Sequence, residues 1–422
     1  MQFTEPLSVL RGLSRQRLAR LVGFSGVVVM AMLVGGKTHA DDSQAFPTVS
    51  PGVTRVATLN GSLYRDQAGK LAQELESGNS EQAKQLASIL QTVRPDIVLI
   101  NEIDFETDHR AVKSLLKDYL AVGQMVGDGP RLEPLAYNYF FAAPVNTGVA
   151  SGLDLSGDGF VGGPDDAWGY GKYEGQYGMV VLSRFPILKN RVRTFQKFLW
   201  KDLPDAKRPM VPASGKSFYS DLVWDRLRLS SKSHWDVPIE LDGGVLHILA
   251  SHPTPPAFDG PEDRNGCRNH DEIRFWTEYI STDGDRDWLV DDAGTKGGLA
   301  ADEKFVIVGD LNSDPADGSG IPQGIIDLLQ HERTFDSRPT SEGAVVAAAK
   351  LGQANARHRG NAALDTSQFS PKNVGNLRVD YCLPSANMTV LASGVFWPKP
   401  GSAGAELVEA TDHRLVWCDI KQ

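Results

Sequence analysis

Six places along the chain carry polar side chains that can bind a metal ion or move a proton, and each adjoins an apolar run typical of a buried β-strand. They are Asn60, Glu102, His252, Asp310 with Asn312, Asp380, and Asp412 with His413. Ligands of α/β proteins bind beyond the carboxyl ends of strands, so we expect these places to meet at one pocket. Asn, Asp and Glu oxygens are hard ligands suited to Mg²⁺ or Mn²⁺, and a histidine beside a carboxylate suits proton transfer. The residue types therefore predict a divalent-cation site with acid–base groups beside it.

The elements that position these residues alternate between strands and helices at first and become strand-rich later. Apolar patterning predicts strands over 53–59, 97–100, 137–143, 179–183, 237–241, 245–251, 305–308, 378–383, 389–396 and 415–420, and helices over 80–93, 110–120 and 269–280. Asp242-Gly243-Gly244 predicts a hairpin turn. Many strands with few helices indicate sheet packed on sheet, with helices on the outer faces.

Six sequence words resemble, in order, the motifs of the endonuclease/exonuclease/phosphatase superfamily, the DNase I-like proteins. They lie at 57–60, 94–102, 178–187, 309–312, 378–381 and 411–413. The resemblance covers residues 53 to 420 and implies an α/β (α+β) fold, a four-layer sandwich of two mixed β-sheets flanked by helices. The activity it implies is metal-dependent hydrolysis of a phosphoester by an activated water.

The resemblance also implies which residues hold the metal. Glu102 is expected to be the principal ligand of Mg²⁺ or Mn²⁺, with Asn60 beside it. Asp412 is expected to be a metal or phosphate neighbour, and Asp310 to bind a metal or the attacking water.

The remaining roles concern water and phosphate. His413 is expected to be the general base that activates water, and Asp380 to orient and charge-stabilise it. Asn312 is expected to hold a phosphate oxygen, and His252 to bind or protonate the phosphate. By this resemblance, Asn312, His252 and the bound cation would stabilise the negative charge that gathers on the phosphoryl oxygens in the transition state.

Two departures narrow the family branch. Abasic-site enzymes usually carry an acidic residue where this chain has Ser62, and Tyr-x-x-Asn where it has Ser251-His252-Pro253. The histidine at position 252 makes the chain more similar to the DNase I, sphingomyelinase and phosphatase branches of the family. Abasic-site repair is therefore disfavoured.

A rival motif stands at 268–272, Arg-Asn-His-Asp-Glu, which is similar to part of the calcineurin-like metallophosphatase signature. That signature has Gly-Asp before it and Gly-His-x-His after it, and this chain has neither there. We interpret the segment as a helix start capped by Asn269. His270 and Glu272 either face the cleft or belong to a plain solvated helix start.

A second metal signal fits a twelve-position calcium loop at residues 154–165. Its expected ligands are Asp154, Ser156, Asp158, the Phe160 carbonyl and Asp165. We expect Ca²⁺ there to order an insertion around 151–176 at the rim of the cleft. The alternative is a flexible loop rich in Gly and Asp.

The N-terminus is typical of an export signal. Arg11–Arg20 is basic, Leu21–Val34 is apolar, and Thr38-His39-Ala40 offers a cleavage site. We predict a signal peptide at 1–40, a linker at 41–52 and the hydrolase domain at 53–422, in an exported, periplasmic or extracellular protein of bacterial type. An uncleaved anchor is the alternative, although the apolar run is shorter than the ~20 residues that span a bilayer.

Loss of residues 1–40 would take the formal net charge from −10 to −14. A strongly basic nucleic-acid binder looks different, although a bound metal offsets negative charge locally. Cys382 and Cys418 lie in two apolar, strand-like runs. If the two strands are neighbours, the cysteines either form a disulfide or stay buried free thiols.

Two functions stay in view. The first is a phosphodiesterase, nuclease or phosphatase, and the second is a non-catalytic, calcium-dependent extracellular binding protein on the same scaffold. The substrate is a phosphoester (nucleic acid, phospholipid or small molecule), no protein partner is implied, and no membrane span is expected after signal cleavage. Basic candidates for contacting nucleic acid are Arg184, Lys201, Lys207, Arg208, Arg264, Arg268, Arg357, His358 and Arg359. The one candidate for an apolar lip that contacts lipid is 195–200, although we favour burial of this segment.

Overall fold

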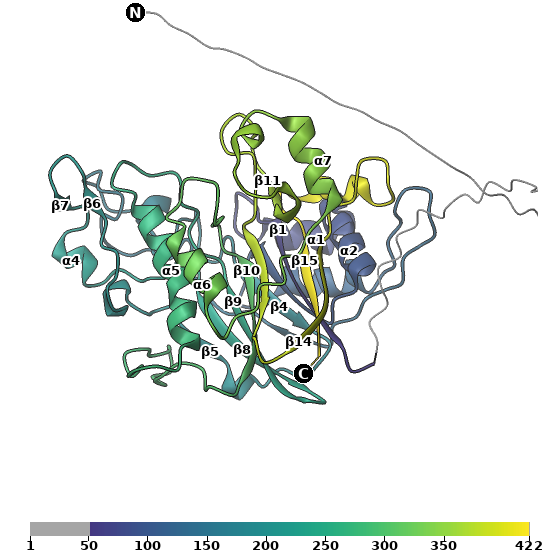
Figure 1. Cartoon of the computed structure of the whole chain (residues 1–422), viewed down its shortest axis with the longest axis horizontal. Coiled ribbons are helices and arrows are strands. Elements are labelled where there is room, and N and C mark those ends of the chain that lie inside the picture. Colours follow the sequence, from purple (N-terminus) through teal and green to yellow (C-terminus); the bar gives the residue numbers. More distant parts are fainter. Residues whose placement is uncertain (1–50, 422) are drawn as a thin grey trace, which may run out of the picture. The chain divides into compact units, whose positions relative to one another are not determined.

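The structure is a computed structural model that describes residues 51–421. The predicted export signal at 1–40 and all but the last two residues of the predicted linker lie outside the described residues. Within the described part, the chain forms two mixed β-sheets packed face to face (Figure 1).

The first sheet has six strands in the order β14-β15-β1-β2-β4-β3. Their bounds are β1 (Thr54–Leu63), β2 (Ile97–Ile103), β3 (Tyr139–Phe141), β4 (Met179–Ser183), β14 (Thr389–Val395) and β15 (Val416–Lys421). β1 and β2 are parallel and the other pairs antiparallel. The β1–β2 register shifts between Asn60 and Leu63, which marks a bulge at the end of the parallel pair.

The second sheet has five strands in the order β13-β10-β9-β8-β5. Their bounds are β5 (Arg193–Thr194), β8 (His234–Leu241), β9 (Gly244–Ser251), β10 (Lys304–Asp310) and β13 (Asp380–Pro384). β9 and β10 are parallel, and β8 and β9 form the predicted hairpin. Two small hairpins stand apart: β6 (Met210–Val211) with β7 (Lys216–Ser217), and β11 (Ser367–Gln368) with β12 (Asn376–Leu377).

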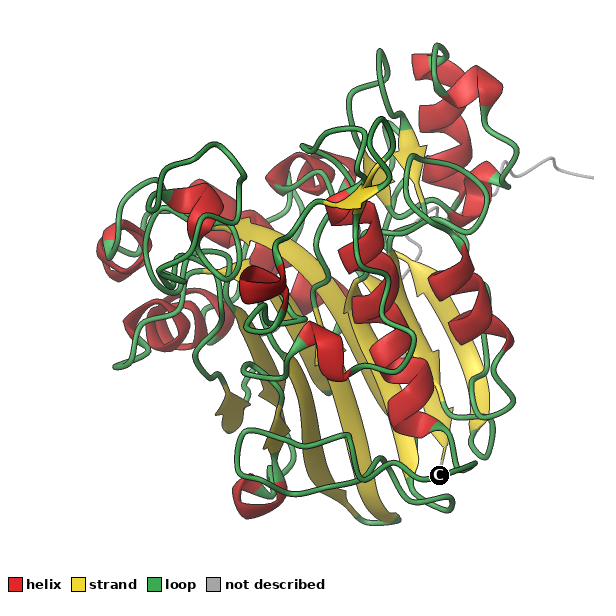
Figure 2. Ribbon diagram, turned by 90° about the vertical axis from the view of Figure 1, so that its left-hand side faces the viewer, coloured by secondary structure: helices red, strands yellow, loops and turns green. Residues whose placement is uncertain are grey.

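Most of the helices cover the outer faces of the two sheets, while α4 lies beside β6 and β7, and α7 lies near β11 (Figures 1 and 2). The helices are α1 (Lys70–Glu76), α2 (Glu81–Val93), α3 (Arg110–Ser114), α4 (Asp221–Trp224), α5 (Arg264–Ile280), α6 (Gln323–Gln330) and α7 (Glu342–Leu351). One apolar core joins α1, α2 and α3 to the first sheet, and a second joins α5 and α6 to the second sheet. A third core lies between the sheets and includes Val56, Leu99, Val237, Ile248 and Val306. The predicted four-layer sandwich is confirmed.

Two helix predictions need correction. The predicted helix 110–120 is an α-helix to Ser114 and a π-helix, η1 (Leu115–Leu120), beyond it. The predicted helix at 269–280 begins earlier, at Arg264, so Asn269 is not its cap. Asn269 lies one turn inside α5, where its amide donates to the backbone oxygens of Thr254 (2.8 Å) and Leu311 (2.9 Å). A long-range contact therefore satisfies a side chain that a local pattern assigns to the helix end.

Candidate active site

One edge of the sandwich collects all six predicted places. The parallel pairs β1–β2 and β9–β10 end there and carry Asn60, Glu102, His252 and Asp310. Asp380 and His413 arrive differently, because β13 and β15 are antiparallel to their neighbours and begin at this edge. Asp310 pairs directly with Asp380, and Thr58 pairs with Val416, three residues after His413.

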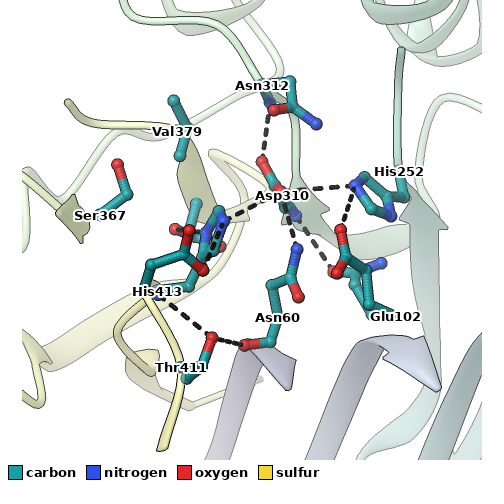
Figure 3. A network of polar contacts seen from close by, with 12 residues as sticks. Asn60, Glu102, His252, Asp310, Asn312, Ser367, Val379, Thr411 and His413 are labelled. Carbon is teal, nitrogen blue, oxygen red and sulfur yellow. Dashed lines mark hydrogen bonds and ion pairs between the residues drawn. The ribbon is translucent and has the colours of Figure 1, made fainter. Parts of the chain in front are cut away.

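Asp310 is the centre of the polar network in Figure 3. Its Oδ2 accepts a hydrogen bond from Asn60 Nδ2 (3.0 Å), and its Oδ1 accepts one from the backbone N–H of Asn312 (2.9 Å). Its own N–H donates to Asn101 Oδ1 (3.1 Å). The carboxylate is thus held by both sheets before any ligand binds.

His413 and Asp380 form a buried pair on one side of Asp310. His413 Nδ1 donates to Asp380 Oδ2 at 2.9 Å, and Asp380 Oδ2 also accepts a hydrogen bond from Thr366 Oγ1 at 2.9 Å. This arrangement turns His413 Nε2 toward Asp310 Oδ2, 3.6 Å away. His413 N donates to Thr411 Oγ1, which donates to the backbone oxygen of Asn60. The imidazole is fixed in a position from which Nε2 can exchange a proton with a neighbour.

The charges of this group depend on one another. Burial disfavours the imidazolium, but Asp380 and Asp310 outweigh burial and raise the pKa of His413 to about 10. Burial raises the pKa of Asp380, with His413 opposing it. For Asp310, burial is outweighed by His413, His252 and Asn60, which hold its pKa well below the usual range. The described residues alone therefore favour a charged imidazolium beside an ionised Asp310.

Three residues at this edge have left-handed backbone conformations, which are uncommon for residues other than glycine. The φ angles are 46° at Ser62, 59° at Glu102 and 51° at Asn312. Ser62 and Glu102 lie on the two strands of the β1–β2 bulge, and Ser62 N donates to Asn60 Oδ1. The strained backbone aims the Glu102 and Asn312 side chains into the cavity that they line.

Oxygen ligands suited to a divalent cation face this cavity. Within residues 51–421, the Glu102 carboxylate accepts no hydrogen bond, and its Oε1 lies 3.9 Å from His252 Nε2. Asp412 is half exposed beside His413, and Asp310 Oδ2 lies 3.4 Å from His252 Nε2. A search of the described residues for three clustered metal-binding side chains finds Asp310, Asp380 and His413. Unengaged carboxylate oxygens at the mouth and the buried pair behind them fit a hard cation such as Mg²⁺ or Mn²⁺.

The network opens into a cavity of about 690 Å³. The cavity lining includes Ser231, Lys232 and Thr254, which the sequence did not mark as site residues, and a fourth polar residue, Arg268. The fourth, Arg268, was a candidate for nucleic-acid contact, and Arg264 also lines the cavity. His270 and Glu272 do not line the cavity: His270 bonds Asp271, and Glu272 is buried behind the wall.

The other basic candidates do not line this cavity. Arg184 pairs with Asp96, Lys201 with Asp225, and Arg208 with Asp221. The predicted apolar lip is part of the core, because Phe195, Phe198 and Trp200 are buried. The burial expected for residues 195–200 is confirmed, and the segment offers no apolar lip to a lipid.

The loop at 154–165 folds around its first carboxylate. Asp154 accepts the N–H groups of Gly157 (2.6 Å) and Gly159 (2.9 Å). Asp166, which the pattern did not include, accepts from Leu155, Ser156 and Gly162. Asp158 is exposed and Asp165 lines the cavity rim. Calcium binding here stays a prediction.

Two further features concern the sequence predictions. Cys382 and Cys418 are free thiols, with their sulfur atoms 2.9 Å apart in the core between the sheets. Among residues 51–421, no helix has both the length and the apolar character that crossing a bilayer requires.

Comparison with known proteins gives one family and several solved structures. The model of the Endonuclease/Exonuclease/phosphatase family matches residues 69–413. An endonuclease/exonuclease/phosphatase from Beutenbergia cavernae is 16% identical, with 87% of this chain and 71% of that chain covered and a TM-score of 0.46. The human Nocturnin catalytic domain with bound sulfate is 12% identical (87% and 93% covered, TM-score 0.41). Sphingomyelinase C from Streptomyces griseocarneus is 16% identical (87% and 99% covered, TM-score 0.40). No curated protein matches the chain.

Proposed function

The chain belongs to the endonuclease/exonuclease/phosphatase family, and on that premise we propose that it is a divalent-metal-dependent hydrolase of phosphoester bonds. The observation that carries the proposal is the His413–Asp380 pair, whose free Nε2 faces Asp310 at the wall of a cavity also lined by Glu102. These side chains combine a proton acceptor with oxygen ligands for a cation.

In the proposed reaction, His413 acts in its neutral form. A water molecule between His413 Nε2 and Asp310 loses a proton to Nε2 and attacks the phosphorus atom, and the P–O bond to the leaving group breaks, so that the leaving group departs with the bonding electrons. Asp380 stabilises the imidazolium that forms, as the 2.9 Å hydrogen bond to Nδ1 allows. Asn312 and His252 contact phosphoryl oxygens from the opposite side. When bound, a cation held by Glu102, Asn60 and Asp412 supplies positive charge that polarises the phosphate and favours proton loss from nearby groups.

Turnover of bis-p-nitrophenyl phosphate and p-nitrophenyl phosphate with Mg²⁺, Mn²⁺ or Ca²⁺ tests the proposal. We expect turnover with at least one ion, and a loss of about 10³-fold in His413→Ala with the fold retained. No turnover with any ion, or a wild-type rate in His413→Ala, would contradict it. The first of these results would favour a non-catalytic binding protein.

We also propose that Ca²⁺ binds the loop 154–165 as a structural ion. The supporting observation is that the loop already curls around two carboxylates: Asp154 accepts the N–H groups of Gly157 and Gly159, and the exposed Asp158 accepts that of Phe160 (2.8 Å). Added Ca²⁺ should raise the melting temperature of the wild type but not of Asp158→Ala. Equal shifts in both proteins would count against a site in this loop.

Export is likewise a proposal, supported by the signal-like pattern at residues 11–40. Expression of the full chain in a Gram-negative host should yield a periplasmic protein that begins at Asp41. The intact mass of that protein is the measurement, and an uncleaved N-terminus in the membrane fraction would favour the anchor alternative.

A further inference from the structure

One wall of the cavity presents hydrogen-bond donors without acceptors. We call it the donor wall, and it consists of Ser231, Lys232, Thr254 and Arg268. Lys232 is only 6% exposed, yet its ammonium group makes no hydrogen bond or ion pair with any described residue. The hydroxyl groups of Ser231 and Thr254 are buried and also lack a partner. Unpaired buried donors are costly, so their clustering in one cavity points to a ligand that supplies acceptors.

Arg268 adds a second positive charge without a carboxylate partner. Its guanidinium donates to three backbone oxygens, those of Leu229 (2.8 Å), Trp168 (2.6 Å) and Arg228 (3.0 Å). These contacts use Nε and Nη2 and fix the orientation of the group while leaving its charge uncompensated. Arg268 thus differs from Arg264 in the same cavity, which is paired with Glu262.

Glu272 builds the wall from behind and does not neutralise it by direct contact. Its carboxylate accepts the backbone N–H groups of Ser231 and Thr254, each at 2.6 Å. Both carboxylate oxygens are therefore occupied, and Glu272 fixes the backbone of the two residues whose hydroxyl groups are unpaired. The segment 268–272 of α5 thereby supplies one member of the wall and the support for two others.

The donor wall adjoins the catalytic residues. Lys232 interacts electrostatically with the carboxylates of Glu272, Glu102 and Asp310, and also with Arg268. Burial lowers its pKa, while these carboxylates oppose the shift. An anion placed against Lys232 would compensate for the loss of hydration of the ammonium group.

We propose that the donor wall is a second anion subsite, and that the substrate is a small phosphoester carrying a second anionic group, a phosphate or a carboxylate. The proposal rests on the proposed function, because the scissile phosphate occupies the catalytic end. A cavity of about 690 Å³ has the size of a small-molecule site.

Matched phosphonates test the subsite by binding, because their C–P bond is not hydrolysed. The carboxylate series is phosphonoacetate, 3-phosphonopropionate and 4-phosphonobutyrate, and each partner is the alkylphosphonate of the same carbon number. Dissociation constants are measured by calorimetry on the mature protein with Mg²⁺. We expect at least one carboxylate member to bind about tenfold or more tightly than its partner.

The substitution Lys232→Met, which keeps the length of the side chain and removes its charge, should abolish that preference. Lys201→Met is the matched control, since Lys201 pairs with Asp225 outside the cavity, and it should retain the preference. Should Lys232→Met fail to fold, as judged by thermal melting, Lys232→Gln replaces it. A wild-type protein without any preference overturns the subsite, as does a preference that survives the loss of the Lys232 charge.

Failure of the subsite and failure of the hydrolase are distinguishable. A protein that discriminates the pairs but hydrolyses no ester keeps the donor wall and loses the catalytic proposal. A protein that hydrolyses nitrophenyl esters without discriminating the pairs loses the donor wall alone.

Discussion

The catalytic end of the cavity and the donor wall differ in how their polar groups are paired within the part of the chain that the structure describes. At the catalytic end, Asp310 and Asp380 each hold hydrogen bonds from neighbouring residues, and His413 lies between them. At the donor wall, Lys232 and the hydroxyl groups of Ser231 and Thr254 have no partner. The first region is pre-organised by the protein itself, as catalysis requires. The second awaits acceptors from outside.

The origin of the two regions explains the difference. Strand ends with a set register carry the residues that we propose to be catalytic, so each side chain meets a partner from another strand. The donor wall comes from two loops that precede β8 and follow β9, and from the second turn of α5. Loops fixed by their backbone, as Glu272 fixes Ser231 and Thr254, leave their side chains available to a ligand.

The substitution Asp310→Asn should have the largest effect, because it removes the charge at the centre of the catalytic end and keeps its shape. We expect kcat for bis-p-nitrophenyl phosphate to fall about 10³-fold, or about 4 kcal/mol. The melting temperature should fall moderately, because His413, His252 and Asn60 stabilise the ionised carboxylate that the amide replaces. Steady-state kinetics and thermal melting measure the two effects. A large fall in melting temperature would show that Asp310 serves the fold instead.

The second prediction concerns His234, which lies behind the donor wall and donates from Nε2 to the backbone oxygen of Glu272 (2.8 Å). Burial lowers the pKa of His234 to about 4. The unfolded chain, with a histidine pKa of about 6.5, takes up a proton over a range where the folded chain does not. The free energy of unfolding should therefore be unaffected by this group above pH 6.5 and fall by about 3 kcal/mol between pH 6.5 and 4.

Urea unfolding at pH 7 and pH 4.5 measures this contribution. The wild type should lose more of its free energy of unfolding on acidification than His234→Gln, because glutamine at position 234 does not titrate. Equal losses in the two proteins would show that other groups account for acid sensitivity.

The third prediction separates the support of the donor wall from catalysis. Glu272→Gln replaces one of two acceptor oxygens by a donor, so a backbone N–H of Ser231 or Thr254 loses its partner. We expect the free energy of unfolding to fall by about 2 kcal/mol. Glu278→Gln on the same helix is the control, with an effect below about 1 kcal/mol, because its ion pairs with Arg274 and Arg286 are near the surface. Comparable losses of unfolding free energy in Glu272→Gln and Glu278→Gln would mean that Glu272 does not support the donor wall.

The smallest predicted effect is that of Thr366→Val at the catalytic end. Thr366 Oγ1 donates to Asp380 and accepts the N–H groups of Val379 and Asp380. We expect kcat to fall about tenfold, or ~1.4 kcal/mol, because Asp380 then holds His413 less firmly. Thr366→Ser keeps the hydroxyl group and should restore most of the rate. An unchanged kcat in Thr366→Val would remove Thr366 from the positioning network.

Local patterns were sufficient to predict the sandwich and the catalytic end. Apolar runs such as 97–100 and 305–308 are short and flanked by polar residues or glycine, so they predict buried strands. A polar residue directly after such a run, like Glu102 or Asp310, must lie at a sheet edge. The apolar residues that mark a segment as a strand and the polar residue at its end therefore lie within a few positions of each other in the sequence.

The donor wall, by contrast, was decided by tertiary packing. Nothing adjacent to Lys232 marks it as buried, and Thr254 follows the β9 end without a helical or strand period. Their environment depends on Glu272 and Asn269, which reach them only because α5 begins at Arg264 and packs on the second sheet. These contacts join residues 15 to 41 positions apart in sequence, and they follow from the packing of whole elements. Periodicity within one segment carries no information about such contacts, so only the folded chain brings these donors together.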